Sequence, residues 1–272
     1  MRIPTIEGVI ERRILINYRV DPEVLGRQLP APFRPLYVGR WGVAGICLIR
    51  LAEVRPKGLP RRWGIASENA AHRFAVEWDV AGRRQTGVYI PRRDTSSWAN
   101  AWAGGRIFPG VHHRADFDVT EDGDHYRIDI ASRDRQMRLS IDAARADVLP
   151  ARSIFPSLAD ASAFFAAGSL GYSPAARDDE FDGLELVTPN WQVAPLAVRR
   201  VTSSYFDDPN PFPPGSIEFD HALLMRDVGH QWRSRSRLRS ADTAGATCAG
   251  VGDFADSVAP YCREAAAATT RS

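Results

Sequence analysis

Lysine is almost absent from this chain of 272 residues: Lys57 is the only one, and the rest of its 35 basic residues are arginine. An arginine side chain stays protonated and does not add to a carbonyl carbon, whereas a deprotonated lysine does so and forms a Schiff base. Covalent capture of a carbonyl compound by lysine is therefore restricted to Lys57. This residue lies in a loop of proline, glycine and arginine, where we expect it to be exposed and solvated.

Cysteine is scarce as well. Cys47, Cys248 and Cys262 form no CxxC pair and show no other metal-ligand spacing. An odd number of cysteines, one of them in an apolar segment, is more typical of the reducing cytoplasm than of a disulfide-stabilised secreted protein. We expect a cytoplasmic protein with no metal and no cofactor.

Long apolar runs and an excess of one charge are also missing. The N-terminus lacks the apolar segment of a signal peptide, and no stretch approaches the roughly 18 apolar residues of a membrane-spanning helix. The net charge is +2, from 35 basic and 33 acidic residues, which gives no electrostatic reason to bind nucleic acid or a membrane. Motifs of serine hydrolases, zinc proteases and nucleotide-binding loops do not occur, which removes the commonest members of those classes.

The sequence does contain a succession of short β-type segments. Between Tyr126 and Ile141, apolar and polar residues alternate on both sides of a polar turn, which predicts an antiparallel hairpin with one solvent-exposed face. Further strands are expected at residues 10–18, 36–54, 70–78, 85–90, 183–188, 192–202 and 217–225. Short helices are expected after the capping residues Asp21, Ser97 and Ser157. Many strands and few helices favour a barrel or a sandwich.

We predict one domain over residues 1–233. From about residue 234 the composition changes to arginine, serine, alanine, threonine and glycine, with too few large apolar residues to form a core. Residues 234–272 are therefore predicted to be a polar tail that is disordered or loosely packed.

Four blocks, in this order along the chain, resemble acetoacetate decarboxylases. They are Asn17-Tyr18-Arg19-Val20-Asp21 with the following proline exit at 30–32, Ser67-Glu68-Asn69-Ala70, Pro91-Arg92-Arg93, and Phe219-Asp220-His221-Ala222. The resemblance covers roughly residues 10 to 230. The loop Arg55-Pro56-Lys57-Gly58-Leu59-Pro60 and the arginine pair are closer to the YqjF-like bacterial branch of that superfamily.

The resemblance implies a fold and a location for a pocket. The implied fold is a cone-like antiparallel β-barrel, mainly β with a few flanking short helices, with a closed internal pocket and assembly into homo-oligomers. Arg92 and Arg93 stand where the family has two adjacent lysines, so the Schiff-base decarboxylation does not carry over.

The candidate site is built around Arg92 and Glu68. Adjacent strand residues point to opposite faces, so only one of Arg92 and Arg93 need face the pocket, and family position favours Arg92. A pocket arginine suits a carboxylate, and Glu68 could orient it or act as a general base. The alternative is that Glu68 and Arg92 form a structural ion pair. His113 and Trp98 are further candidate ligand-binding residues, with surface or packing roles as the alternatives.

Three functions remain open. The first is non-covalent binding of a small organic acid or keto acid in the barrel pocket. The second is an enzyme that uses acid–base chemistry, such as enolisation, dehydration or cyclisation, with Glu68 as base and Arg92 stabilising an enolate. The third is an oligomeric structural protein with an unused cavity. An enzyme requires several polar groups within hydrogen-bond reach of one another in the pocket, whereas a binding protein requires only the arginine and apolar walls.

Overall fold

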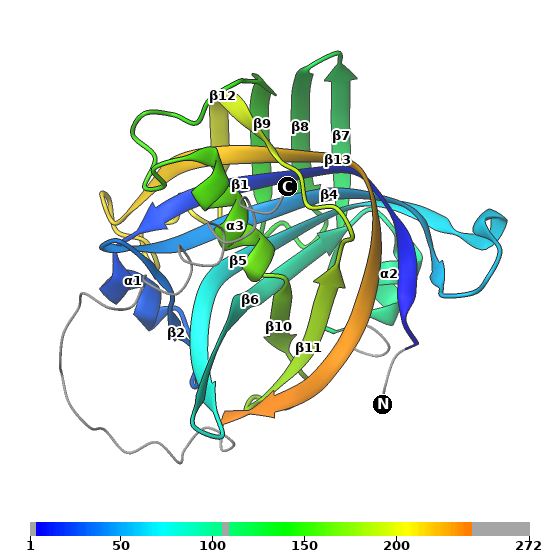
Figure 1. Ribbon diagram of the computed structural model, residues 1–272, viewed down its shortest axis with the longest axis horizontal. Coiled ribbons are helices and arrows are strands. Elements are labelled where there is room, and N and C mark those ends of the chain that lie inside the picture. The colour runs from blue at the N-terminus through cyan, green and yellow to red at the C-terminus, as the bar shows by residue number, and fades with distance from the viewer. Residues whose placement is uncertain (1–3, 105–108, 241–272) are drawn as a thin grey trace, which may run out of the picture.

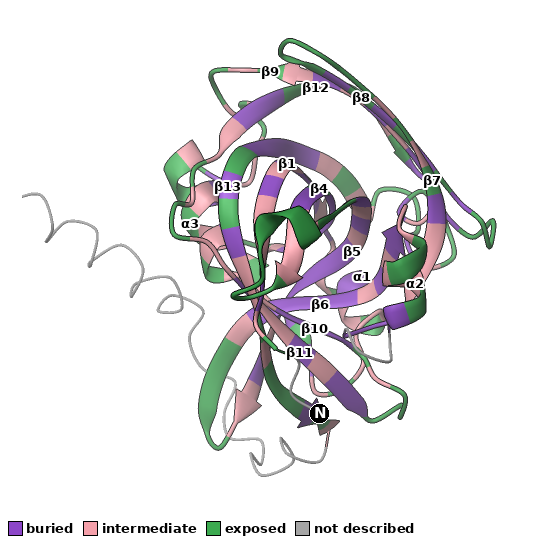
Figure 2. Ribbon diagram, turned by 90° about the vertical axis from the view of Figure 1, so that its right-hand side faces the viewer, coloured by how far each residue is buried: buried purple, intermediate pink, exposed green. Residues whose placement is uncertain are grey.

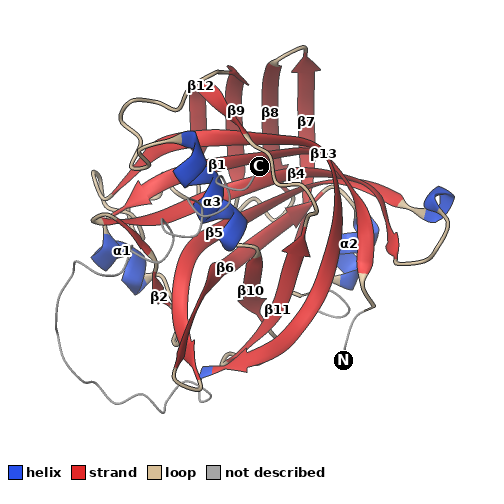
Figure 3. Ribbon diagram, viewed as in Figure 1, coloured by secondary structure: helices blue, strands red, loops and turns tan. Residues whose placement is uncertain are grey.

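The computed structural model describes residues 4–104 and 109–240 (Figure 1). Over these residues the chain is mainly β (Figure 3). The helices are α1 (Pro22–Arg27), α2 (Trp98–Ala103), α3 (Leu158–Ala167) and the 3-10 helix η1 (Arg61–Trp63). The strands are β1 (Ile6–Val20), β2 (Arg34–Pro35), β3 (Tyr37–Val38), β4 (Trp41–Pro56), β5 (Ile65–Val80), β6 (Arg83–Thr95), β7 (His112–Asp122), β8 (His125–Ser132), β9 (Arg138–Arg145), β10 (Leu170–Pro174), β11 (Glu180–Val187), β12 (Ala194–Ser203) and β13 (Ile217–Arg239).

Two closed circuits of paired strands share β1, β4, β5, β6 and β13. The seven-strand circuit runs β13–β1–β4–β5–β6–β10–β11 and closes where β11 pairs with β13. The nine-strand circuit continues from β6 through β7, β8, β9 and β12 and returns to β13. Figure 2 shows β7, β8, β9 and β12 on one side of the shared strands, with β10 and β11 on the other side.

The predicted fold class is confirmed: the chain forms an antiparallel-rich β structure with a few short helices. Two pairings of the described strands depart from a fully antiparallel barrel, because β6 pairs in parallel with both β7 and β10. No helix of the described residues is long and apolar enough to cross a membrane.

The local predictions are confirmed where sequence pattern and capping agree. β8 alternates strictly between exposed and buried residues and pairs with β9, as the predicted hairpin requires. Asp21 caps α1, its Oδ1 accepting a hydrogen bond of 2.8 Å from the backbone amide of Glu23, with Pro22 in the first turn. Ser97 and Ser157 cap α2 and α3 in the same way.

The last strand is longer than its pattern suggests. The strand is expected only as far as Met225, but β13 continues to Arg239, because its far half pairs with β11. Arg235 and Arg237 form ion pairs with acidic residues of β11, and Val228 and Leu238 are buried. Residues 234–239 thus belong to this strand, and the boundary predicted at 233 falls inside it. The remainder of the predicted tail, from 241, lies outside the described residues.

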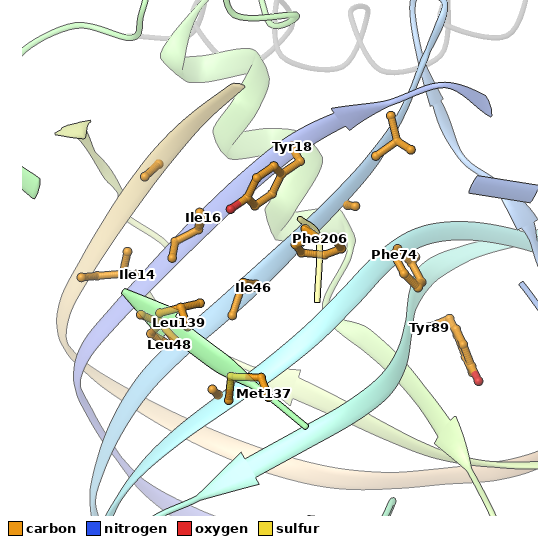
Figure 4. Close-up of a cluster of buried hydrophobic side chains, with 14 of the residues drawn as sticks. Ile14, Ile16, Tyr18, Ile46, Leu48, Phe74, Tyr89, Met137, Leu139 and Phe206 are labelled. Carbon is orange, nitrogen blue, oxygen red and sulfur yellow. The ribbon is translucent and has the colours of Figure 1, made fainter. Parts of the chain in front are cut away.

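Each circuit has its own apolar contents. The interior of the nine-strand circuit is densely filled, with Ile14, Ile16, Ile46 and Leu48 packed against Leu139 and other side chains from β9 (Figure 4). A second cluster lies on the opposite face of β1 and β4 and includes residues of α3. Dense packing in the first circuit leaves the seven-strand circuit as the place for a ligand.

Candidate functional site

A cavity of about 150 Å³ lies within the seven-strand circuit. Most of its wall is apolar and comes from the circuit's own strands, with Leu15 of β1, Ile49 of β4, Ile90 of β6 and Leu186 of β11 among the lining residues. Phe165, on α3, adds to the wall. The strand faces that line the cavity therefore form a largely hydrophobic pocket, which is typical of a small-molecule binding site.

A bulge in β6 decides which arginine of the adjacent pair faces this cavity. Tyr89 pairs with Phe74, but Arg92 pairs with His72, so β6 contains one more residue than β5 between these two pairs. An extra residue reverses the side-chain alternation beyond it, and Pro91, which has no amide hydrogen to donate, is tolerated at such a bulge. Val88 and Ile90 line the cavity before the bulge, and Arg93 rather than Arg92 lines it afterwards.

Three arginines line the cavity: Arg13 from β1, Arg73 from β5 and Arg93 from β6. The Nε of Arg13 donates to Sγ of Cys47 at 3.2 Å. The guanidinium carbon of Arg73 lies 4.9 Å from the centroid of the Phe165 ring. The Nε of Arg93 donates to Oγ of Ser173 at 3.1 Å. None of these partners is a carboxylate.

None of these three guanidiniums forms an ion pair with a carboxylate of the described residues. Arg12 and Arg92, which are buried, show the contrast: Arg12 is paired with Glu68 and Glu121, and Arg92 with Asp94 and Asp134. Nη1 of Arg13 and Nε of Arg73 are also buried without a hydrogen-bond partner among the described residues. Charges within a protein are normally paired, so the described part of this cavity wall lacks carboxylate partners for its arginines.

The electrostatics of the wall follow from its burial. Burial is the main cause that lowers the pKa of Arg73 to about 10, and the charge of Arg13 acts in the same direction. Burial also lowers the pKa of Arg93 to about 10, so both side chains stay cationic at neutral pH. Burial, assisted by the charge of Arg93, lowers the pKa of His112 to about 3, so this cavity-lining imidazole is neutral.

A row of polar residues across four strands holds Arg73 in place. Arg73 of β5 is opposite Gly45 of β4, Gly45 is opposite Asn17 of β1, and Asn17 is opposite His221 of β13. Nη2 of Arg73 donates to Oδ1 of Asn17 at 2.5 Å, passing over Gly45. A Cβ at position 45 would lie 2.5 Å from the Ile16 carbonyl oxygen and 3.3 Å from Nη2 of Arg73, so glycine provides the space for this hydrogen bond.

The far end of the row is anchored by a carboxylate. Nε2 of His221 lies 3.0 Å from Nδ2 of Asn17, and its Nδ1 lies 2.6 Å from Oδ2 of Asp220. Asp220 also accepts hydrogen bonds from the Ser153 hydroxyl and the Ile154 amide. A neutral His221 that donates from Nδ1 and accepts at Nε2 satisfies both contacts, which fixes the orientation of the Asn17 amide and hence of Arg73.

The DUF2071 family model, described as an uncharacterized conserved protein, matches residues 9–219 of the chain. The chain belongs to the DUF2071 family. No curated protein matches it.

Solved structures similar to this DUF2071 chain are acetoacetate decarboxylase-like. The decarboxylase of Legionella pneumophila subsp. pneumophila str. Philadelphia 1 is 11% identical, with a TM-score of 0.55 over 86% of this chain and 88% of that one. A decarboxylase-like enzyme of Sphingomonas wittichii RW1 is 11% identical, with a TM-score of 0.52 over 87% and 93%. The enduracididine biosynthesis enzyme MppR, complexed with pyruvate, is 11% identical, with a TM-score of 0.51 over 88% and 90%. At this identity the likeness shows a shared fold.

The predicted residues Glu68 and Arg92 are not brought together in this DUF2071 chain. Glu68 is paired with Arg12 at 2.6 Å and with Arg50 at 3.2 Å. Arg92 donates to both oxygens of Asp94, at 3.0 and 2.8 Å, and to Asp134. Neither side chain lines the cavity. The two residues therefore belong to separate ion-pair clusters on the other face of β5 and β6.

The other predicted residues divide between the cavity and the surface. Arg93 lines the cavity, as one of the two adjacent arginines was expected to do. His113 lies outside it with Nδ1 3.0 Å from Asp134, while its neighbour His112 is on the cavity wall. Trp98 begins α2 as predicted but is 73% exposed and contributes nothing to the wall.

Arg13 and Arg73 are absent from the prediction, although a signal for them is present in the sequence. Each interrupts a β-type apolar segment, Arg13 between Ile10 and Ile14 and Arg73 between Ala70 and Val76. Charged residues within such segments are buried only when something compensates them. The sequence does not reveal that protein carboxylates compensate Arg12 but leave Arg13 and Arg73 without an ion pair.

Removal of the Asn17 side chain tests the polar row. Asn17→Ala leaves Nη2 of Arg73 and Nε2 of His221 without their partner, which should lower the free energy of unfolding by about 1–3 kcal/mol. Ser203→Ala is a matched control, because the Ser203 hydroxyl is buried without a hydrogen bond among the described residues and its loss should change little. Urea denaturation of both variants measures the difference. Equal stability of the two variants would show that the row is dispensable.

Proposed function

We propose that this protein binds a small organic acid or keto acid without covalent chemistry, in the cavity of the seven-strand circuit. The observation that carries the proposal is the set of three cavity guanidiniums, Arg13, Arg73 and Arg93, that have no carboxylate partner in the described chain. A guanidinium offers a planar fork of N–H donors that matches a carboxylate. An acid in the cavity would accept hydrogen bonds from the unpartnered N–H groups of Arg13 and Arg73.

Non-covalent binding follows from the side chains available. Arg92 and Arg93 occupy the positions of the lysine pair in the decarboxylase resemblance, and neither forms an imine. Lys57 is exposed, in the segment between β4 and η1, and does not line the cavity. The pyruvate complex of MppR supports a keto acid as the type of ligand, since that protein shares the fold. A cytoplasmic location and a homo-oligomeric assembly, expected from the sequence, form part of the same proposal.

Acid–base turnover by Glu68 and Arg92 receives no support from the site geometry. Glu68 already accepts hydrogen bonds from two arginines, and its carboxylate is not on the cavity wall. A general base must come within hydrogen-bond reach of the proton that it removes. We therefore assign these residues to stability and propose binding as the function.

A thermal-shift screen tests the proposal. Pyruvate, acetoacetate and 2-oxoglutarate are compared with their methyl esters, which keep the carbon skeleton but lose the carboxylate charge. At least one acid should raise the melting temperature of the parent protein, and Arg93→Gln should abolish that rise. Arg127→Gln is the matched control, because Arg127 is an exposed arginine of β8 whose side chain is 67% exposed. Equal stabilisation of Arg93→Gln and the parent would refute the anion site, and a borohydride-trapped adduct at Lys57 would refute non-covalent binding.

A further inference from the structure

The titratable groups on the cavity wall include three arginines and one carboxylate. They are Arg13, Cys47, Arg73, Arg93, Asp94 and His112. His112 is neutral, because its pKa is lowered to about 3 mainly by burial. The Asp94 carboxylate is directed to Arg92, with two hydrogen bonds of 3.0 and 2.8 Å, rather than to any cavity arginine. The three guanidiniums therefore have no carboxylate partner on the wall.

The strand register relates these three arginines to one row of paired residues that crosses four strands. Leu15, Cys47, Ala71 and Arg93 follow one another across β1, β4, β5 and β6. Arg73 lies two residues from Ala71 along β5, and Arg13 lies two residues from Leu15 along β1. The two arginines are on opposite sides of this row. Cys47 accepts a hydrogen bond from Arg13, and its effect on Arg73 and Arg93 is to raise their pKa, against the larger lowering by burial.

Cys47 and Ala71 are small cavity-lining residues between the strands that carry Arg13 and Arg93, and Nε of Arg13 reaches Sγ of Cys47. Arg13 and Arg93 stand on β1 and β6, which are separated by two strands of the circuit. A single carboxylate that binds either Arg13 or Arg93 leaves the other arginine without a carboxylate partner. A short chain with a carboxylate at each end can reach both sides.

Resting on the proposed function, we infer that the ligand is a short dianionic acid, such as a dicarboxylate or an oxo-dicarboxylate, rather than a monocarboxylate. A monocarboxylate leaves two of the three guanidiniums without a carboxylate partner, whereas a dicarboxylate leaves one. Uncompensated buried charge is the costly state in a low-dielectric interior, so the second carboxylate contributes affinity. In this arrangement Arg93 and Arg13 bind the two ends, and the fork of Arg73, held by Asn17, lies between them.

Titration calorimetry with matched acids tests the inference. 2-Oxoglutarate and 2-oxopentanoate share a five-carbon 2-oxo chain and differ only in the second carboxylate, and succinate and butyrate form a matched four-carbon pair. The dianion of each pair should bind at least about tenfold more tightly, since hydrogen bonds between charged groups are among the stronger ones. Arg13→Gln should reduce this preference to about twofold or less, because the second carboxylate loses its guanidinium partner.

The outcomes distinguish this inference from the proposed function. Equal affinity for both members of each pair overturns the dianion inference and leaves the acid site standing. No measurable binding of any of the four acids overturns both proposals. A preference for the dianion that persists unchanged in Arg13→Gln also overturns the inference, because the second carboxylate would then be bound elsewhere.

Discussion

Replacement of Arg92 by glutamine should lower the free energy of unfolding by about 3–5 kcal/mol, whereas Arg93→Gln should leave it unchanged or raise it. Arg92 is the partner of Asp94, which is fully buried, and removal of one member of a buried ion pair leaves the other uncompensated. Arg93 has no carboxylate partner in the described chain, so its replacement removes an uncompensated cation. Two adjacent residues of one type are thus expected to affect stability very differently.

Urea denaturation at neutral pH measures this difference directly. The double variant Arg92→Gln/Asp94→Asn is the control, since it removes both charges and should recover part of the lost stability. If Arg92→Gln and Arg93→Gln destabilise the protein to the same extent, the assignment of the two arginines to opposite faces of β6 is incorrect.

Acidification from pH 7.5 to pH 5.5 should lower the free energy of unfolding by about 4 kcal/mol, because three histidines are buried in the neutral form. Burial is the first cause in each case: it lowers the pKa of His72 and His112 to about 3 and that of His230 to about 4, from an ordinary value of 6.5. Below pH 6.5 the unfolded chain takes up protons that the folded chain does not. Stability is therefore fully present above pH 6.5 and is lost as the pH falls, at about 1.4 kcal/mol per histidine over this interval.

A His72→Leu variant isolates one third of this effect. Both ring nitrogens of His72 lack a hydrogen bond among the described residues, so leucine should be tolerated at pH 7.5. The variant should lose about 1.4 kcal/mol less than the parent between the two pH values. Denaturation curves at both pH values provide the test, and an identical pH dependence in parent and variant would contradict a neutral buried His72.

Sequence patterns predict this fold well where local and global signals coincide. The alternation in β8 gives the hairpin, and Asp21-Pro22 gives the start of α1. The extension of β13 to Arg239 does not follow from its pattern, because apolar residues are sparse in its far half, which pairs with β11 and forms ion pairs with it. Such pairing depends on which strand lies alongside, and a single segment carries no information about that.

The candidate site was harder to predict for the same reason. Simple alternation from Val88 and Ile90 points Arg92 into the cavity, and only the bulge at Pro91 redirects Arg93 there. A bulge becomes visible when the register against β5 is known. Likewise, Arg12 and Arg13 are indistinguishable as residue types, yet only Arg12 meets carboxylates, from β5 and β7.

Calorimetric titration of 2-oxoglutarate into the parent, Arg93→Gln and Arg92→Lys tests the central claim, an acid site on the Arg93 face of β6, most directly. We expect Arg93→Gln to weaken binding at least about tenfold, through loss of a charged hydrogen-bond donor, and Arg92→Lys to bind within about twofold of the parent. Unchanged affinity in Arg93→Gln, or a loss confined to Arg92→Lys, would contradict the account.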